Sequence, residues 1–169
     1  QGGGDGFRGA RPVYIPPVPG NVASGKPYLT WETKLGGVIQ SLTDGYLGSR
    51  LYWRSRGHCY VLVDLGGVEP IDKILIHTSK YSLRSAEVSV SDDDLTYYRV
   101  GAAQNVLEGP EGPFVFRFED LGTRGRYVHV KTGSAGLWPH ISEIEVFRGA
   151  HDPRSARFGG AGFQRGEMS

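Results

Sequence analysis

The sequence predicts an all-β fold, a jelly-roll β-sandwich of about eight antiparallel strands. Three observations predict it. Short segments rich in β-branched and aromatic residues alternate between apolar and polar positions. Gly, Asp, Asn and Pro, which favour turns, separate these segments. No window of a dozen residues keeps the apolar spacing of an amphipathic helix.

The alternating segments follow one another between residues 26 and 147. They cover residues 26–31, 59–65, 70–78, 86–92, 95–101, 113–121, 126–132 and 141–147. Alternation gives each of them one core face; Val88 and Val90, for example, lie opposite Glu87 and Ser89. The acidic run at 91–94 separates two segments, so we expect a hairpin turn there and not a metal cluster. The connection at 32–58 has no clear strand periodicity.

Composition divides the chain into three parts. Residues 1–20 hold six Gly and four Pro, which predicts a flexible arm. Residues 150–169 hold four Gly, three Arg and two Phe, which predicts a tail that is either a solvated linker or a segment that orders against a partner. Residues 21–149 remain for a single sandwich domain.

Charge and composition disfavour several partners. Nineteen Lys and Arg balance 18 Asp and Glu, so a basic surface that would hold nucleic acid is missing. No apolar run approaches the roughly 20 residues of a membrane helix. The single cysteine, Cys59, excludes an internal disulfide framework and is expected to be a buried, inert thiol. The chain starts with Gln and shows no leader, which favours a processed, secreted or extracellular protein.

The sequence shows no constellation that predicts an enzyme. Nucleophile elbows, phosphate-binding loops and zinc-binding motifs are absent, and the five His are scattered. Glu143 and Glu145 are the best pair of carboxylates, but they lie two apart on one strand, where they would rarely flank a cleft. We therefore expect a protein without catalytic residues.

A series of motifs carries a resemblance to a known family. In chain order they are NVASGKP at 21–27, SLTDG at 41–45, YWRSRGH at 52–58, VDLGG at 63–67, AEVSVSDD at 86–93, RYVHV at 126–130 and ISEIEVF at 141–147. Together they resemble the discoidin family, also called the coagulation factor type C domain, one of the galactose-binding-like β-sandwiches. The resemblance covers about residues 21–149 and implies a galactose-binding-like jelly roll.

The resemblance implies a structural Ca²⁺ between the D-G turn and the last strand. The matching residues are Ser41, Asp44, Tyr46, Ser55, Ser142 and Glu143. Hard carboxylate, hydroxyl and carbonyl oxygens from distant segments are the ligands that Ca²⁺ prefers. The alternative is that Asp44 only makes a local Asx turn and Glu143 is a solvated strand residue.

The resemblance also implies a glycan site at the loop tips. The matching residues are Trp53, Arg54, Arg56, His58, Tyr81, Arg84, Trp138 and His140. Arg and His can bond sugar hydroxyls, and aromatic rings can stack on the apolar face of a sugar. Trp53 has an alternative role as a core residue of the sandwich. The chain lacks the paired cysteines of the fucose lectins, so the resemblance does not extend to fucose specificity.

These observations favour a non-catalytic, lectin-like carbohydrate-binding module whose partner is a glycan or glycoprotein. The alternative is a structural or assembly subunit that uses the same sandwich and associates with itself through its two tails. Membrane binding through Leu47, Arg50 and Leu51 is a weaker alternative.

Overall fold

The computed structural model describes residues 19–30, 35–37, 42–47, 51–53, 58–78, 83–104, 107–109, 112–134 and 139–167 of the chain. The strands of this part are β1 (Tyr28–Thr30), β2 (Leu35–Gly37), β3 (Leu51–Trp53), β4 (His58–His77), β5 (Leu83–Ser91), β6 (Thr96–Gln104), β7 (Leu107–Gly109), β8 (Gly112–Phe118), β9 (Thr123–Ser134), β10 (His140–Ile141), β11 (Glu143–Arg148) and β12 (Phe163–Gln164). Two 3-10 helices, η1 (Pro153–Ser155) and η2 (Arg165–Glu167), have three residues each. Within these ranges no helix has the length and apolarity needed to cross a membrane.

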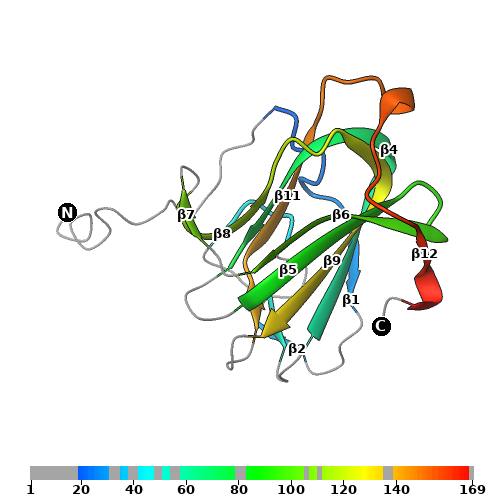
Figure 1. Cartoon of the computed structure of the whole chain (residues 1–169). Helices are drawn as coiled ribbons and strands as arrows, with labels where there is room; N and C mark the ends of the chain where they lie inside the picture. The colour runs from blue at the N-terminus through cyan, green and yellow to red at the C-terminus, as the bar shows by residue number, and fades with distance from the viewer. Residues whose placement is uncertain are drawn as a thin grey trace.

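One curled antiparallel sheet provides both layers of the sandwich. Its strand order is β12-β6-β5-β9-β4-β8-β7, and β1 and β11 also pair with β4. The first part of β4 pairs with β9 and β1, and its last part pairs with β8 and β11. In Figure 1, β4 curves over one end of the molecule and returns in the other layer.

The bend in β4 is a bulge at its two glycines. Gly66 has φ of +87°, and the pairing with β9 shifts between Asp64 and Glu69. The side chain of Arg126 in β9 donates two hydrogen bonds to Asp64, of 2.9 and 3.1 Å, across this bulge. The sequence predicts two strands here, at 59–65 and 70–78. They form a single strand because the glycines bend the chain without turning it.

Alternating residues of the strands fill the space between the layers, as predicted. Val88 and Val90 of β5 and Val128 and Val130 of β9 are fully buried with Ile74, Ile76 and Ile144 from the other layer. Cys59 is also buried, which confirms the expected structural thiol. Together these residues form the main core of the described part.

The acidic run at 91–94 forms the predicted turn between β5 and β6. Oδ1 of Asp93 accepts hydrogen bonds from the amides of Leu95 and Thr96, at 2.9 and 3.1 Å. These amides lower the pKa of the Asp93 carboxyl. Asp94 adopts a positive φ of 63°, which Asp tolerates better than most residues. A side chain of the turn itself thus accepts the hydrogen bonds of these two backbone amides.

Three short strands were not predicted from the alternation of apolar and polar residues. β2 and β3 lie in the connection at 32–58; β3 pairs with β2 on one side and with β10 on the other, in a separate three-stranded sheet. β7 has only three residues and pairs with β8. Segments of two or three residues are too short to show a period of two, so sequence alone gave no signal for them.

Residues 150–167 differ from the expectation of a solvated linker, because they pack on the sandwich. Phe158 contacts Tyr98 with ring centroids 4.8 Å apart. Phe163 in β12 pairs with Tyr97 of β6 and adds a strand to the edge of the large sheet. In Figure 1 this red segment follows one side of the molecule. The division of the chain at residues 20 and 150 remains a prediction, and residues 1–18 of the arm lie outside the described ranges.

Candidate functional site

Three strand ends that flank predicted binding loops meet at one end of the large sheet. His58, the first residue of β4, pairs with Gly133 near the end of β9. On its other side Gly133 pairs with Ser85 near the start of β5. Arg84 precedes Ser85, and the side chains of both His58 and Arg84 are exposed. Strand pairing therefore brings His58 and Arg84 to the same end of the sandwich.

His140 comes to this end from the separate three-stranded sheet. It starts β10, and its carbonyl oxygen accepts a 2.7 Å hydrogen bond from Oγ1 of buried Thr78. Thr78 directly follows β4. Because β4 curves back on itself, its first and last residues lie at the same end of the molecule (Figure 1). His140 is half-buried, so part of its side chain reaches the surface.

The remaining predicted glycan residues are less fully described. Trp53 ends β3, where its backbone pairs with Leu35 of β2. Outside the described residues lie Arg54, Arg56, Tyr81 and Trp138. The structure thus places His58, Arg84 and His140 of the predicted glycan set.

Two of the predicted calcium ligands form a carboxylate pair. Glu143 is 1% exposed, and its Oε2 accepts a 2.9 Å hydrogen bond from the amide of Gly45. Its Oε1 is buried and has no hydrogen-bond partner among the described residues. Burial raises the pKa of Glu143 to about 9; the Gly45 amide opposes this rise, and neighbouring Asp44 adds to it. Glu143 is therefore not the solvated residue of the alternative interpretation.

Asp44 makes the expected local turn as well. Its Oδ1 accepts a 2.9 Å hydrogen bond from the amide of Tyr46, and its side chain is exposed. An Asx turn at the D-G step and a carboxylate beside Glu143 are thus both properties of the same residue. The turn places the carboxyl group of Asp44 next to the buried carboxyl group of Glu143.

The carboxylate pair fits a hard cation. A buried carboxylate next to a second carboxylate is costly, and the cost is relieved either by a proton on the buried group or by a positive charge between the two. Of the other predicted ligands, Ser142 is buried and its amide donates to the His77 carbonyl at 2.8 Å, whereas Ser41 and Ser55 lie outside the described residues. The described ranges contain no group of three or more His, Cys, Asp or Glu arranged for a metal.

A second buried acid beside Glu143 was not predicted. Nε2 of His77 lies 2.7 Å from Oε1 of Glu145, and both side chains are almost fully buried. Alternation along β11 placed Glu143 and Glu145 on the polar face, and nothing in that pattern indicates that this face is covered. Because both glutamates are buried, they do not flank an open cleft of the glycosidase type.

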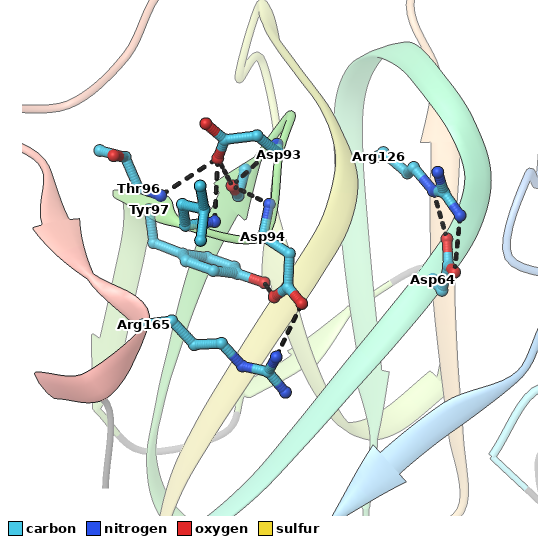
Figure 2. A network of polar contacts seen from close by, with 9 residues as sticks. Asp64, Asp93, Asp94, Thr96, Tyr97, Arg126 and Arg165 are labelled. Atoms are coloured by element: carbon cyan, nitrogen blue, oxygen red, sulfur yellow. Dashed lines mark hydrogen bonds and ion pairs between the residues drawn. The ribbon is translucent and has the colours of Figure 1, made fainter.

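A polar clamp that holds the C-terminal segment was also missed. Asp94 accepts a 2.5 Å hydrogen bond from the hydroxyl of Tyr97 and a 2.8 Å hydrogen bond from Nη1 of Arg165. Figure 2 shows the three side chains converging below the 91–94 turn. Burial, with help from Asp94, raises the pKa of the Tyr97 phenol well above its usual range. Arg165 lies 71 residues beyond Asp94, and no local signal connects them.

Solved structures share this fold. The chain matches the lectin domain of lectinolysin complexed with the Lewis b antigen at a TM-score of 0.61 and 21% identity, over 77% of this chain and 97% of that one. It matches CpGH89CBM32-5 from Clostridium perfringens, in complex with GalNAc-β-1,3-galactose, at 0.58 and 14% identity, over 71% and 94%. The prediction of an all-β, galactose-binding-like fold, with structural similarity to discoidin-like modules and lectin domains, is confirmed.

The chain also matches a part of a larger protein. Its TM-score with SpGH29 is 0.64 at 15% identity, over 76% of this chain but only 28% of that one. No protein-family model and no curated protein matches the sequence. Modules of this fold thus also occur within longer chains.

Proposed function

We propose that this protein is a non-catalytic carbohydrate-binding module that recognises a glycan at the end of the sandwich where His58, Arg84 and His140 lie. The observation that carries the proposal is the match, over nearly their whole length, to a lectin domain solved with Lewis b and to a module solved with GalNAc-β-1,3-galactose. Because the identities are only 14 to 21%, we do not transfer the sugars bound by these two proteins, and we argue the ligand from this chain's own side chains.

The chemistry at this end suits a sugar. Arg84 offers a fixed fork of donors to neighbouring hydroxyl oxygens, and the ring nitrogens of His58 and His140 can form hydrogen bonds with further hydroxyl groups. Trp138 and Tyr81, which the sequence assigns to the adjoining loops, would add the aromatic surface on which a sugar ring stacks. None of these groups needs to exchange a proton with the ligand.

The proposal includes no reaction. Glu143 and Glu145 are the carboxylates that would have to act as acid and base, and both are buried with partners inside the protein. A glycosidase needs one carboxylate on each side of an accessible bond. We therefore assign these two residues to the stability of the fold.

We further propose that Asp44 and Glu143 hold a structural Ca²⁺, with Tyr46, Ser142, Ser41 and Ser55 as the other predicted ligands. The bound ion would supply the charge that compensates the two carboxylates. Glu143 begins β11 and Asp44 lies in the D-G turn, so these residues would fix the turn against the last strand of the sandwich. Support comes from the buried, unpartnered Oε1 of Glu143.

Calorimetric titration tests the glycan proposal. We expect saturable binding of at least one of galactose, N-acetylgalactosamine, fucose and the Lewis b tetrasaccharide by the wild-type chain, and a loss of tenfold or more in affinity for Arg84→Ala, about 1.4 kcal/mol. Arg148→Ala is the matched control, because Arg148 is exposed at the far end of β11, where it pairs with Glu69. Equal affinities for the Arg84→Ala and Arg148→Ala variants would contradict the placement of the site.

A further inference from the structure

The outer face of the large sheet carries a cavity that the glycan proposal does not use. Its volume is about 570 Å³, within the range typical of small-ligand sites. The floor is formed by polar side chains of β5, β6 and β9, and the wall by the C-terminal segment, from Gly159 to Phe163. The binding end with His58 and Arg84 lies apart from this cavity, since neither residue lines it.

Strand register assembles the floor. Ser89 of β5 lies opposite Arg99 of β6 and opposite His129 of β9, and Glu87 lies opposite Lys131. All five side chains point to the face away from the main core, because their neighbours Val88 and Val130 are part of that core. Three adjacent strands thus place five polar groups side by side.

Three of the five floor side chains form a connected network of charges. Nη1 of Arg99 donates a 2.7 Å hydrogen bond to Oε1 of Glu87, and Nζ of Lys131 lies 3.8 Å from Oε2 of the same carboxylate. His129 is 3% exposed and stacks on Tyr60 with ring centroids 5.7 Å apart. Burial, followed by the charge of Lys131, lowers the pKa of His129 to about 4, so its ring is neutral at physiological pH.

The wall is held in place and consists largely of main chain. A side chain at Gly159 would clash with the carbonyl oxygen of Arg99, so this glycine allows the segment to lie directly on β6. Phe163 stacks on Tyr97 at 6.1 Å, and Arg165 binds Asp94 at 2.8 Å (Figure 2). The cavity is therefore a preformed feature and not a gap under a loose tail.

The lining selects a class of ligand. The charges of Arg99 and Lys131 are balanced by Glu87 and by Glu167, which also lines the cavity, so the site has no net charge to attract an ion. Paired donors and acceptors suit a hydroxyl group, which both donates and accepts. Phe163 adds an apolar surface of the kind that packs on the C–H face of a sugar ring.

We propose that this cavity is a second binding site, walled by the C-terminal segment, that takes a neutral, hydroxyl-rich ligand of mono- or disaccharide size. The site goes beyond the glycan site at the end of the sandwich and does not depend on it. Ala161 is exposed on the wall, so a large side chain at this position would fill the cavity without altering the sheet.

Amide chemical-shift mapping of the full, isotope-labelled chain tests the proposal. The probes are galactose, glucose, N-acetylglucosamine and lactose, each raised to tens of millimolar, with glucuronate as an anionic probe. We expect at least one neutral sugar to shift the amides of Ser89, Arg99 and Gly160 saturably. Ala161→Trp should weaken this response tenfold or more, whereas Ala161→Ser should retain it. Glu87→Gln, which keeps the shape of the floor, should weaken it as well.

Each other outcome overturns the second site. Shifts confined to His58, Arg84 and His140 would leave only the end of the sandwich as a sugar site, so the two proposals fail separately. A response to glucuronate alone would identify an anion site. Binding that is unchanged in a folded Ala161→Trp variant would place the ligand elsewhere, and no response to any neutral sugar would leave the cavity without its proposed ligand.

Discussion

The amide of Gly45 donates a 2.9 Å hydrogen bond to Oε2 of Glu143, which joins the D-G turn to the start of β11 across 98 residues. The second oxygen of this buried carboxyl has no hydrogen-bond partner among the described residues. The stability of the fold should therefore depend on the protonation of this carboxyl and on cations bound to it, and both effects can be measured.

The Glu143 contribution to the stability of the metal-free protein should fall as the pH rises above about 4.5, and the net loss should be clearest above pH 6.5, where the opposing contribution of His129 is constant. The pKa of Glu143 is raised from 4.5 to about 9, so the unfolded chain loses a proton that the folded chain retains. The contribution of Glu143 is complete below pH 4.5 and is lost as the pH approaches 9, with a slope of at most about 1.4 kcal/mol per pH unit. Urea unfolding in EDTA across this range measures it. Glu143→Gln should flatten the curve, and exposed Glu119→Gln should not.

Ca²⁺ should raise the melting temperature of the wild-type chain at pH 7.5, and EDTA should reverse the effect. The ion binds the folded state, where the two carboxylates are adjacent, and so stabilises it by mass action. Asp44→Asn and Glu143→Gln should each abolish most of the rise. Scanning calorimetry measures it, and a full Ca²⁺ response in both variants would remove the proposed ion from this pair.

On the acid side, His129 should make the protein less stable below pH 6.5. Burial and Lys131 lower its pKa to about 4, so the folded state favours the neutral ring. Its contribution is present above pH 6.5 and is lost as the pH falls through 4, because the unfolded chain takes up a proton first. His129→Gln should weaken this pH dependence, and exposed His58→Gln should not. Identical unfolding curves for the wild type and His129→Gln between pH 4 and 6.5 would contradict the assignment.

The close approach of Gly159 to β6 should make this glycine hard to replace. Gly159→Val adds a side chain that meets the Arg99 carbonyl, and we expect a loss of about 1 to 3 kcal/mol or release of the segment. Gly166→Ala is the matched control in the same segment, since a Cβ there meets nothing within 4 Å. Thermal unfolding and the rate of tryptic cleavage after Arg157 measure the two effects.

The clamp between Asp94 and Arg165 should protect the C-terminal segment. Both side chains are partly exposed, so we expect Arg165→Gln to change global stability by less than about 1 kcal/mol. Tryptic cleavage after Arg157 should nevertheless become faster, because the ion pair holds the end of the segment against the turn that precedes β6. Arg154→Gln is the control: Arg154 lies in the same segment but is 90% exposed and pairs only locally, with Asp152. Equal cleavage rates for the two variants would show that the clamp does not hold the segment.

Local alternation predicted the central strands well. The segments at 86–92 and 126–132 alternate with a period of two over Val88, Val90, Val128 and Val130, and they form β5 and β9 with these four residues in the core. The periodicity reports burial on one face only. It could not show that the opposite face of β11 is covered. The pattern marks Glu143 and Glu145 as polar, and it therefore did not predict that both are buried.

The C-terminal segment could not be predicted, because its contacts are not local. Its glycines suggested an unstructured tail, yet Gly159 and Gly162 let the main chain approach Arg99 and Tyr98 closely. Arg165 forms an ion pair with Asp94, which lies 71 residues earlier in the chain. The cavity on the outer face depends on this docking, so no reading of β5, β6 and β9 alone would indicate it.

Binding of the folded chain to an array of immobilised glycans tests the central claim most directly. The account predicts saturable binding to a defined group of glycans, inhibited by the corresponding free sugar and reduced by Arg84→Ala but not by Arg148→Ala. An absence of binding to every glycan, with Ca²⁺ present and the fold verified, would contradict a carbohydrate-binding function.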